Sequence, residues 1–320
     1  MTHGMLEPSD KQFIDRFDQC LIPKDQWTHT AHIRMAWIQF NRSKDFAEAM
    51  DRIRLGIQKL NASLGSIGYH ETVTVAYARL IYERLLLQNQ AHRWIDFFQA
   101  HQDLVAKEPS ILAPHYSAES LSSAQSKIRF VEPKLKPLPL AGIIRDATQD
   151  DVAAMLEIYA PFIKNTSVTF EISIPSVIDF TNKWIEIKKL APWLIYEWEG
   201  RVVGYVYASK HREREAYRWS IEVSAYIDTA FHRRGVARIL YSALFRRLKA
   251  QGFCMALAGI TLPNESSVRF HEAMGFERIG VYKKIGFKMG AWHDVGWWQK
   301  SLQGPEFVPG LILGPGMLNP

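Results

Sequence analysis

The sequence predicts an all-α helical domain followed by an α/β (α+β) domain with a central mixed sheet. In residues 9–127, apolar side chains recur at the spacing of amphipathic helices. Beyond residue 142, short runs of alternating apolar residues follow one another with helical segments between them, as in a sheet covered by helices. The segment 131–140 contains three prolines and cannot continue a helix. The predicted organisation is a helical domain at 1–127, a Pro-rich linker at 128–141, the α/β domain at 142–303 and an irregular Gly/Pro-rich tail at 304–320.

Length and composition fit two globular domains. A chain of 320 residues is long for one domain, and 47% of its residues are hydrophobic while 22% are charged. The formal net charge of +6 is small and basic residues alternate with acidic ones, so we expect no nucleic-acid binding. Cys20 and Cys254 match neither a disulfide framework nor a zinc site, which favours a cytoplasmic location. No apolar run approaches about 18 residues, so we expect neither secretion nor membrane insertion.

The helical domain contains several stretches of helical periodicity. Phe13, Ile14 and Phe17 mark the first of them. Further helices are expected at about residues 32–40, 46–60, 71–88 and 94–105.

Two histidine-bearing segments of this domain form a candidate metal site. His29 and His32 are three residues apart and share a helix face, while His70 and Glu71 stand at the start of another helix that could face them. Histidine and carboxylate side chains from two helices are suited to a divalent metal or a small ligand. The alternative is structural: Thr28 or Thr30, and also Glu71, act in helix capping, and the histidines are hydrogen-bonded in the core.

The α/β domain begins with a strand at Ile143, and Thr148 is a candidate N-cap for the helix that follows. Residues 193–197 and 201–208 form an antiparallel hairpin in this prediction. A strand over 219–228 then enters a glycine-bearing turn that opens a helix, and a buried strand and a short helix ending at Gly275 follow.

The glycine-bearing turn, Arg233 to Ala237, is a candidate phosphate cradle. Consecutive backbone N–H groups at a helix N-terminus attract an anion, and Gly235 lets it approach closely. A pyrophosphate is the expected ligand. The alternative is that Gly235 only relieves a tight strand-to-helix turn.

This order of elements resembles the GNAT acetyltransferases, and six ordered blocks between about residues 143 and 302 resemble the phosphinothricin and methionine-sulfone N-acetyltransferases within that family. The blocks are 217–224, the turn, 251–253, 262–264, 267–276 and 290–299. The resemblance implies that acetyl-CoA is the cofactor. The residues that it implies for cofactor binding are Tyr226, Ile227, His232, Arg233, Arg234, Gly235, Val236, Ala237, Arg238, Asn264 and Ser267. His232 stands where the family usually has Gln or Arg, which weakens one possible phosphate contact.

The resemblance also implies catalytic residues. Glu222, a carboxylate in the middle of an apolar strand, is the expected base that deprotonates the amine, directly or through water. His271 is the expected acid or proton relay, because the phosphinothricin group carries histidine at the matching position. The alternatives are a solvent-facing Glu222 on a half-exposed strand and a helix-surface His271.

Four further residues match the family's acceptor pocket. Arg212, Arg214 and Tyr217 are expected to hold the acidic end of an amino-acid substrate, because guanidinium groups suit a carboxylate and a phosphinate or sulfone. Phe170 matches a pocket-lining position. The alternatives are a merely solvated loop and a buried loop anchor.

The resemblance therefore implies an N-acetyltransferase that moves acetyl from acetyl-CoA to the primary amine of a small amino-acid-like substrate of the phosphinothricin or methionine sulfone/sulfoximine type. A homodimer is a further expectation. The alternative hypothesis is a ligand- or metal-sensing protein in which the helical domain binds and the acetyltransferase fold is regulatory.

Overall fold

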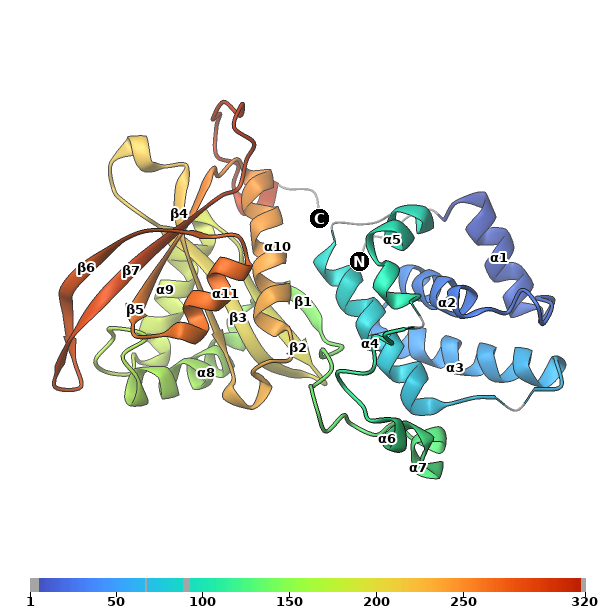
Figure 1. Ribbon diagram of the computed structural model, residues 1–320. Coiled ribbons are helices and arrows are strands. Elements are labelled where there is room, and N and C mark those ends of the chain that lie inside the picture. The colour runs from blue at the N-terminus through green and yellow to red at the C-terminus, as the bar shows by residue number, and fades with distance from the viewer. Residues whose placement is uncertain (1–5, 67, 89–92, 107, 318–320) are drawn as a thin grey trace. The chain divides into compact units, whose positions relative to one another are not determined.

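The computed structural model describes residues 6–66, 68–88, 93–106 and 108–317 (Figure 1). The chain divides into two compact units, residues 1–142 with 233–235, and residues 143–232 with 236–320. The first unit is helical and the second contains the sheet.

The helical unit is built on α1 (Pro8–Asp18), α2 (His29–Arg42), α3 (Phe46–Ser63) and α4 (Glu71–Leu87). Shorter elements follow: α5 (Trp94–Ala100), η1 (Gln102–Leu104), α6 (Ala118–Ser122) and α7 (Ala124–Ile128). The helix expected over 94–105 is interrupted because His101 leaves helical geometry, with φ of −133° and ψ of 50°. The other expected helices are present, with ends that differ by a few residues.

α2 is the central helix of this unit. Trp37, Ile38 and Phe40 are almost fully buried on it, and burial continues around most of its circumference. A helix that is buried on most of its sides lies inside a core. Side-chain caps define the starts of its neighbours: Asp45 accepts a hydrogen bond from the Glu48 N–H, and His70 accepts one from the Val73 N–H.

The segment 128–141 has no helix or strand beyond the end of α7 at Ile128, yet it packs against the helical unit. Leu138 is fully buried in the helical core. The Tyr116 hydroxyl donates to the Val131 carbonyl at 2.8 Å, and the Thr72 hydroxyl donates to the Arg129 carbonyl at 3.0 Å. Its prolines prevent regular structure, and these contacts hold it in place.

The second unit contains a seven-stranded sheet in the order β1-β2-β3-β4-β5-β7-β6. Its strands are β1 (Ile143–Asp146), β2 (Trp193–Trp198), β3 (Arg201–Lys210), β4 (Ser220–Ile227), β5 (Met255–Leu262), β6 (Glu277–Lys288) and β7 (Ala291–Ser301). Its helices are α8 (Val152–Asn165), α9 (Val177–Leu190), α10 (Val236–Gln251) and α11 (Glu265–Ala273), with short turns η2 (Gln149–Asp151), η3 (Glu215–Tyr217), η4 (Thr229–Phe231) and η5 (Pro315–Met317). The expected mixed sheet is confirmed: β4 and β5 are parallel and the other neighbouring strands are antiparallel.

Both faces of the sheet are covered, with α8 and α9 on one face and α10 and α11 on the other (Figure 1). Alternation along β2 explains this arrangement. Trp193 and Ile195 belong to the core shared with α8 and α9, while Leu194 and Tyr196 are equally buried on the opposite face. A strand whose successive residues are all apolar can be buried only between two layers.

The parallel pair β4 and β5 separates soon after it forms. The strands are paired only from Ser220 opposite Met255 to Glu222 opposite Leu257. β4 continues to Ile227 and β5 to Leu262 without pairing to each other. The backbone of β4 beyond Glu222 therefore presents an edge that no strand covers, although β4 lies inside the sheet.

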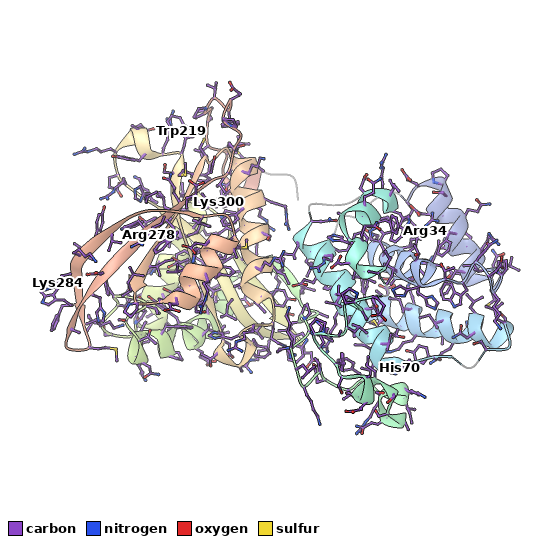
Figure 2. All side chains as sticks on the ribbon, in the orientation of Figure 1. Arg34, His70, Trp219, Arg278, Lys284 and Lys300 are labelled. Carbon is purple, nitrogen blue, oxygen red and sulfur yellow. The ribbon has the colours of Figure 1, made fainter. Side chains whose placement is uncertain are left out.

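The tail lies along the sheet-bearing unit. Trp219, labelled in Figure 2, donates its indole N–H to the Gly310 carbonyl at 2.8 Å. Gln251 at the end of α10 donates from its side chain to the Leu313 carbonyl at 2.7 Å. These polar contacts order a segment that glycine and proline keep out of regular structure up to η5.

Candidate active site

The turn between β4 and α10 has the backbone geometry of an anion cradle. Arg233 and Gly235 both have positive φ, 62° and 80°, and α10 begins directly afterwards at Val236. Successive N–H groups in such a conformation, at a helix N-terminus, point toward a common anion. His232 contributes by bracing the turn, because its Nε2 lies 3.1 Å from the Ile227 carbonyl. The turn therefore fits the pyrophosphate of acetyl-CoA.

The uncovered edge of β4 leads from this cradle toward Glu222. An extended ligand that carries amides can hydrogen-bond to an unpaired strand edge in the way that an added strand does. Residues 223–227 therefore offer an unpaired backbone edge to which an amide-bearing ligand, such as the pantetheine arm of acetyl-CoA, can hydrogen-bond.

The backbone groups of Tyr226 and Ile227 form part of this unpaired edge of β4. The Tyr226 side chain is packed in an aromatic cluster, with its ring centroid 4.5 Å from that of Tyr159 and 5.5 Å from that of Tyr205. Burial there raises the pKa of the Tyr226 phenol well above its ordinary value. Its hydroxyl therefore stays protonated.

Glu222 is paired with a histidine that the sequence analysis did not select. His211 follows the end of β3, and its Nδ1 lies 2.7 Å from Oε1 of Glu222. The Glu222 side chain is one-third exposed, so solvent or a substrate can reach it. The His211 ring also meets Tyr217 and Trp297 edge-on, at centroid distances of 6.0 and 5.9 Å.

Trp297 is the other residue that sequence reasoning missed. It lies on β7 opposite Gly259 of β5. A Cβ added to Gly259 would lie only 3.3 Å from the Trp297 ring, so the glycine leaves room for the indole. Its buried indole N–H has no acceptor among the described residues and is free to donate to a bound molecule. The sequence offered one clue to His211, because this residue immediately precedes Arg212 in a loop that was already predicted to bind the acceptor. No local sequence feature distinguished Trp297.

His271 is buried, contrary to the helix-surface alternative. Its Nδ1 lies 2.8 Å from the Ser267 carbonyl and its Nε2 lies 3.1 Å from the Tyr241 hydroxyl. A carbonyl only accepts, so Nδ1 carries the proton and Nε2 accepts from tyrosine. Burial lowers the pKa of His271, although the hydrogen bond to Ser267 opposes this shift. The ring is therefore neutral near pH 7, with a fixed tautomer.

Asn264 and Ser267 organise the start of α11. The Asn264 side chain caps this helix by accepting from the Ser267 N–H at 3.2 Å. The Ser267 carbonyl in turn orients His271. Both cofactor-binding candidates therefore have structural contacts of their own.

The predicted acceptor clamp lies on the exposed loop between β3 and β4. Its acidic residues are engaged by other cations: Lys210 pairs with Glu213 at 2.7 Å, and Arg218 pairs with Glu215 at 2.6 Å. Arg212 and Arg214 are exposed and have no ion pair among the described residues. Tyr217 is also exposed, and it contacts the His211 ring.

Phe170 sits against the β6–β7 hairpin. A Cβ added to Gly286 would clash with the Phe170 ring, at 2.2 Å from its nearest carbon atom. The adjacent Thr169 accepts a hydrogen bond from the buried Lys288 ammonium at its carbonyl, at 2.8 Å, and shares a hydrogen bond with the Tyr159 hydroxyl. Burial lowers the pKa of Lys288. Phe170 is thus a loop residue whose ring packs against the β6–β7 hairpin while 37% of the residue stays exposed.

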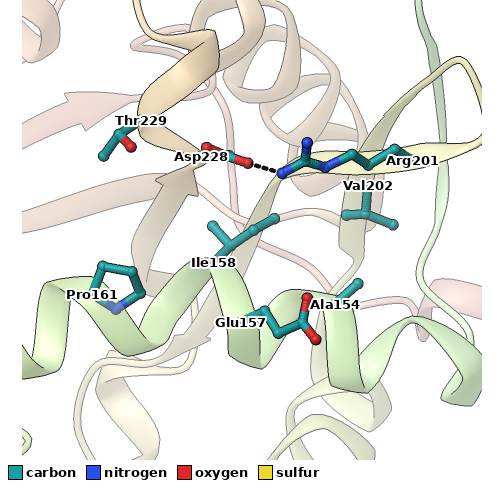
Figure 3. Close-up of a pocket in the computed structure, with 8 residues that line it drawn as sticks. All are labelled: Ala154, Glu157, Ile158, Pro161, Arg201, Val202, Asp228 and Thr229. Carbon is teal, nitrogen blue, oxygen red and sulfur yellow. Dashed lines mark hydrogen bonds and ion pairs between the residues drawn. The ribbon is translucent and has the colours of Figure 1, made fainter.

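A hollow of about 330 Å³ lies between α8, the start of β3 and the residues that follow β4 (Figure 3). Arg201 and Asp228 form an ion pair at its edge. No residue predicted to bind cofactor or acceptor lines it.

The four predicted metal ligands have other partners. His29 and His32 bond the carbonyls of Leu104 and Thr28. Both ring nitrogens of His70 are used, by the Leu121 carbonyl and the Val73 N–H. Glu71 forms a salt bridge with Arg54 at 2.7 Å. Among the described residues no three His, Cys, Asp or Glu side chains are grouped to hold a metal ion, so the predicted divalent-metal site is not supported.

The structural alternative describes these residues better, with one change. Thr28 caps α2, as that alternative held, but the cap of α4 is His70 rather than Glu71. A histidine nitrogen with a lone pair can accept from a helix N–H as a carboxylate does, and Glu71 is drawn instead to Arg54.

Among the described residues, the sheet has one parallel pair, and this pair opens beside a glycine-bearing turn at a helix N-terminus, an arrangement that is typical of GNAT acyltransferases. A family model described as an acetyltransferase (GNAT) domain matches residues 144–297. The chain is 37% identical over 162 residues to phosphinothricin N-acetyltransferase of Streptomyces viridochromogenes, a match that covers 51% of this chain and 88% of that protein. The chain belongs to the GNAT acetyltransferase family.

Two further comparisons agree. The chain is 31% identical over 163 residues to the L-methionine sulfoximine/L-methionine sulfone acetyltransferase of Salmonella typhimurium, covering 50% of this chain and 94% of that protein. A GNAT superfamily phosphinothricin acetyltransferase from Sinorhizobium meliloti, crystallised with acetyl-CoA, is 34% identical with a TM-score of 0.51, covering 53% of this chain and 93% of that one.

These relatives make the protein an acetyl-CoA-dependent N-acetyltransferase, which confirms the expected fold, enzyme class and cofactor. They do not favour the sensing alternative. In the described part of the chain, no helix has the length and apolar character needed to cross a membrane.

Proposed function

We propose that this enzyme acetylates the primary amine of a small amino acid whose side chain ends in a phosphinate, sulfone or sulfoximine group. Two of its relatives are named for phosphinothricin and for methionine sulfoximine and methionine sulfone. The observation that carries the proposal is the path from Glu222 through His211 to Tyr217. It connects the candidate base to the loop that bears the two unpaired arginines.

The clamp suits such an acceptor because neither Arg212 nor Arg214 has an ion-pair partner among the described residues. The acidic residues of the loop, Glu213 and Glu215, are paired with other cations. A free guanidinium can form two parallel hydrogen bonds to a carboxylate or a phosphinate. The acceptor amine must then lie within reach of Glu222.

Glu222 acts as the base in this proposal. Acetyl-CoA supplies an acetyl group on a thioester, which only an unprotonated amine attacks. The carboxylate removes the amine proton, directly or through water, and His211 holds the carboxylate in position by donating its Nδ1–H. The departing thiolate takes up a proton, for which the proton removed from the amine is the source. His271 stays a predicted relay for this proton, and it can act only if one of its present hydrogen bonds, to the Ser267 carbonyl or the Tyr241 hydroxyl, is exchanged.

A panel assay tests the substrate class. Release of free CoA is measured with phosphinothricin, methionine sulfone, methionine sulfoximine, methionine and a neutral amine such as benzylamine. We expect the three tetrahedral acidic or sulfonyl amino acids to exceed methionine, and methionine to exceed benzylamine, in kcat/KM. Equal rates with benzylamine and phosphinothricin would place the substrate class elsewhere while leaving the acetyltransferase assignment intact.

A further inference from the structure

The helical unit contains a cavity of about 310 Å³ that the acetyl transfer reaction does not explain. It lies between α2, α3 and α4, and the segment before α4 closes one side. Most of its wall is apolar, with Ile33, Ile53 and Ile81 among the lining residues. Its size falls at the lower end of the range for small-molecule sites, roughly 300–1,000 Å³.

The polar groups on this wall are mainly imidazoles and phenols. His29, His32 and His70 all line the cavity, together with Tyr69 and Tyr77. The histidines that the sequence singled out are thus gathered around one space, although they do not form a metal site.

Hydrogen bonds determine which nitrogen of each ring is available. Nε2 of His29 lies 3.0 Å from the Leu104 carbonyl, and Nδ1 of His32 lies 2.7 Å from the Thr28 carbonyl. Each of these nitrogens must carry the proton because a carbonyl can only accept. Nδ1 of His29 and Nε2 of His32 are therefore lone-pair acceptors. His70 differs, since both of its nitrogens already have partners.

The described lining residues of the cavity include no Asp, Glu, Lys or Arg. Burial lowers the pKa of His32, more than the Thr28 hydrogen bond raises it, so this ring is neutral near pH 7. An ion would lose its hydration here without gaining a counter-charge, which disfavours charged ligands.

We infer that this cavity binds one uncharged, mostly apolar molecule of about the size of a substituted aromatic ring, which carries an O–H or N–H group. That group donates a hydrogen bond to the lone-pair Nε2 of His32, and the apolar body packs against the isoleucines. Phenols and indoles are the chemical class that matches both requirements. This site is independent of the acetyl acceptor.

The full-length enzyme is titrated with three probes of similar shape, phenol, toluene and benzoate, with binding followed by calorimetry or by NMR of the histidine ring nitrogens. Phenol should bind saturably and about three- to tenfold more tightly than toluene, since one neutral hydrogen bond distinguishes them. Benzoate should bind more weakly than either. The histidine nitrogen signals should shift with phenol and not with toluene.

His32→Phe supplies the matching variant, because phenylalanine keeps a ring beside Trp27, which packs 3.8 Å from the His32 ring. It should reduce phenol affinity to that of toluene and leave toluene binding unchanged. His115→Phe is the control, since His115 is a buried, carbonyl-bonded histidine of the same unit that does not line the cavity.

Absence of saturable phenol binding to the wild-type enzyme would overturn the inference. So would equal affinity for phenol and toluene. Both comparisons use the unmodified protein, so they remain decisive if His32→Phe does not fold.

Discussion

Nδ1 of His211 lies 2.7 Å from Oε1 of Glu222, at the position where β4 and β5 make their last pair before separating. The contact joins a loop that faces solvent to the strand that carries the candidate base. The His211 ring thus connects the candidate base, Glu222, to the loop that bears the candidate acceptor clamp.

Replacement of Glu222 by Gln should lower kcat about 100-fold or more, because the amide cannot accept the amine proton. Acetyl-CoA affinity should be retained, since the cradle and the β4 edge are untouched. Steady-state kinetics and calorimetry measure the two quantities. Glu186→Gln, on the exposed side of α9, is the matched control. Near-wild-type turnover with saturating acceptor would remove Glu222 from the mechanism.

Replacement of His211 by Phe should lower kcat about tenfold, because the Glu222 carboxylate loses the N–H donor that holds it in position for the amine. Phenylalanine keeps a ring between Tyr217 and Trp297, so packing is conserved. His211→Gln restores an N–H donor and should recover part of the lost kcat. Steady-state kinetics with saturating acetyl-CoA compare the two variants. Equal losses in both would show that the N–H donor has no role.

Arg212→Ala and Arg214→Ala should each lower kcat/KM for an acidic amino-acid acceptor by about ten- to a hundredfold. The KM for acetyl-CoA and the rate with benzylamine should change little. Arg218→Ala is the control because that guanidinium is already paired with Glu215. If all acceptors respond alike and weakly, the loop is merely solvated.

Gly235→Glu should abolish acetyl-CoA binding, because the side chain and its negative charge both enter the anion cradle. Gly235→Ala separates the two causes. With φ of 80° at this position, the added Cβ strains the turn without adding charge, so a smaller loss is expected. Calorimetric titration with acetyl-CoA provides the readout. Gly280→Ala, where an added Cβ meets nothing within 4 Å, should bind normally.

The buried His271 should make stability depend on pH. Its pKa is lowered in the folded state, so below the ordinary value of 6.5 the unfolded chain binds more protons and folding weakens as the pH falls. Above pH 6.5 the neutral His271 makes its full contribution to the free energy of unfolding. The loss cannot exceed about 1.4 kcal/mol per pH unit for one proton. Thermal unfolding at pH 7.5 and 5.5 should show a smaller difference for His271→Asn than for wild type; an equal difference would assign the effect to other groups.

Local sequence predicted much of the fold. Helix starts follow from caps within three residues of the chain, such as Thr28 before α2 and Thr148 with Asp151 before α8. The alternation in β4 placed Glu222 on a strand, and Gly235 marked the turn that follows. These features depend on neighbours in the chain, which a sequence displays directly.

Tertiary structure alone decided which of these residues meet. His211 reaches Glu222 because β3 and β4 pair in one register, and His271 is buried because α11 folds its ring toward Tyr241 on α10. The same holds for two histidines of the helical unit. Their spacing is compatible with a metal site, but one nitrogen of His29 is bonded to the Leu104 carbonyl and one nitrogen of His70 to the Leu121 carbonyl. A hydrogen bond between distant segments depends on how the whole chain packs, and no local periodicity encodes it.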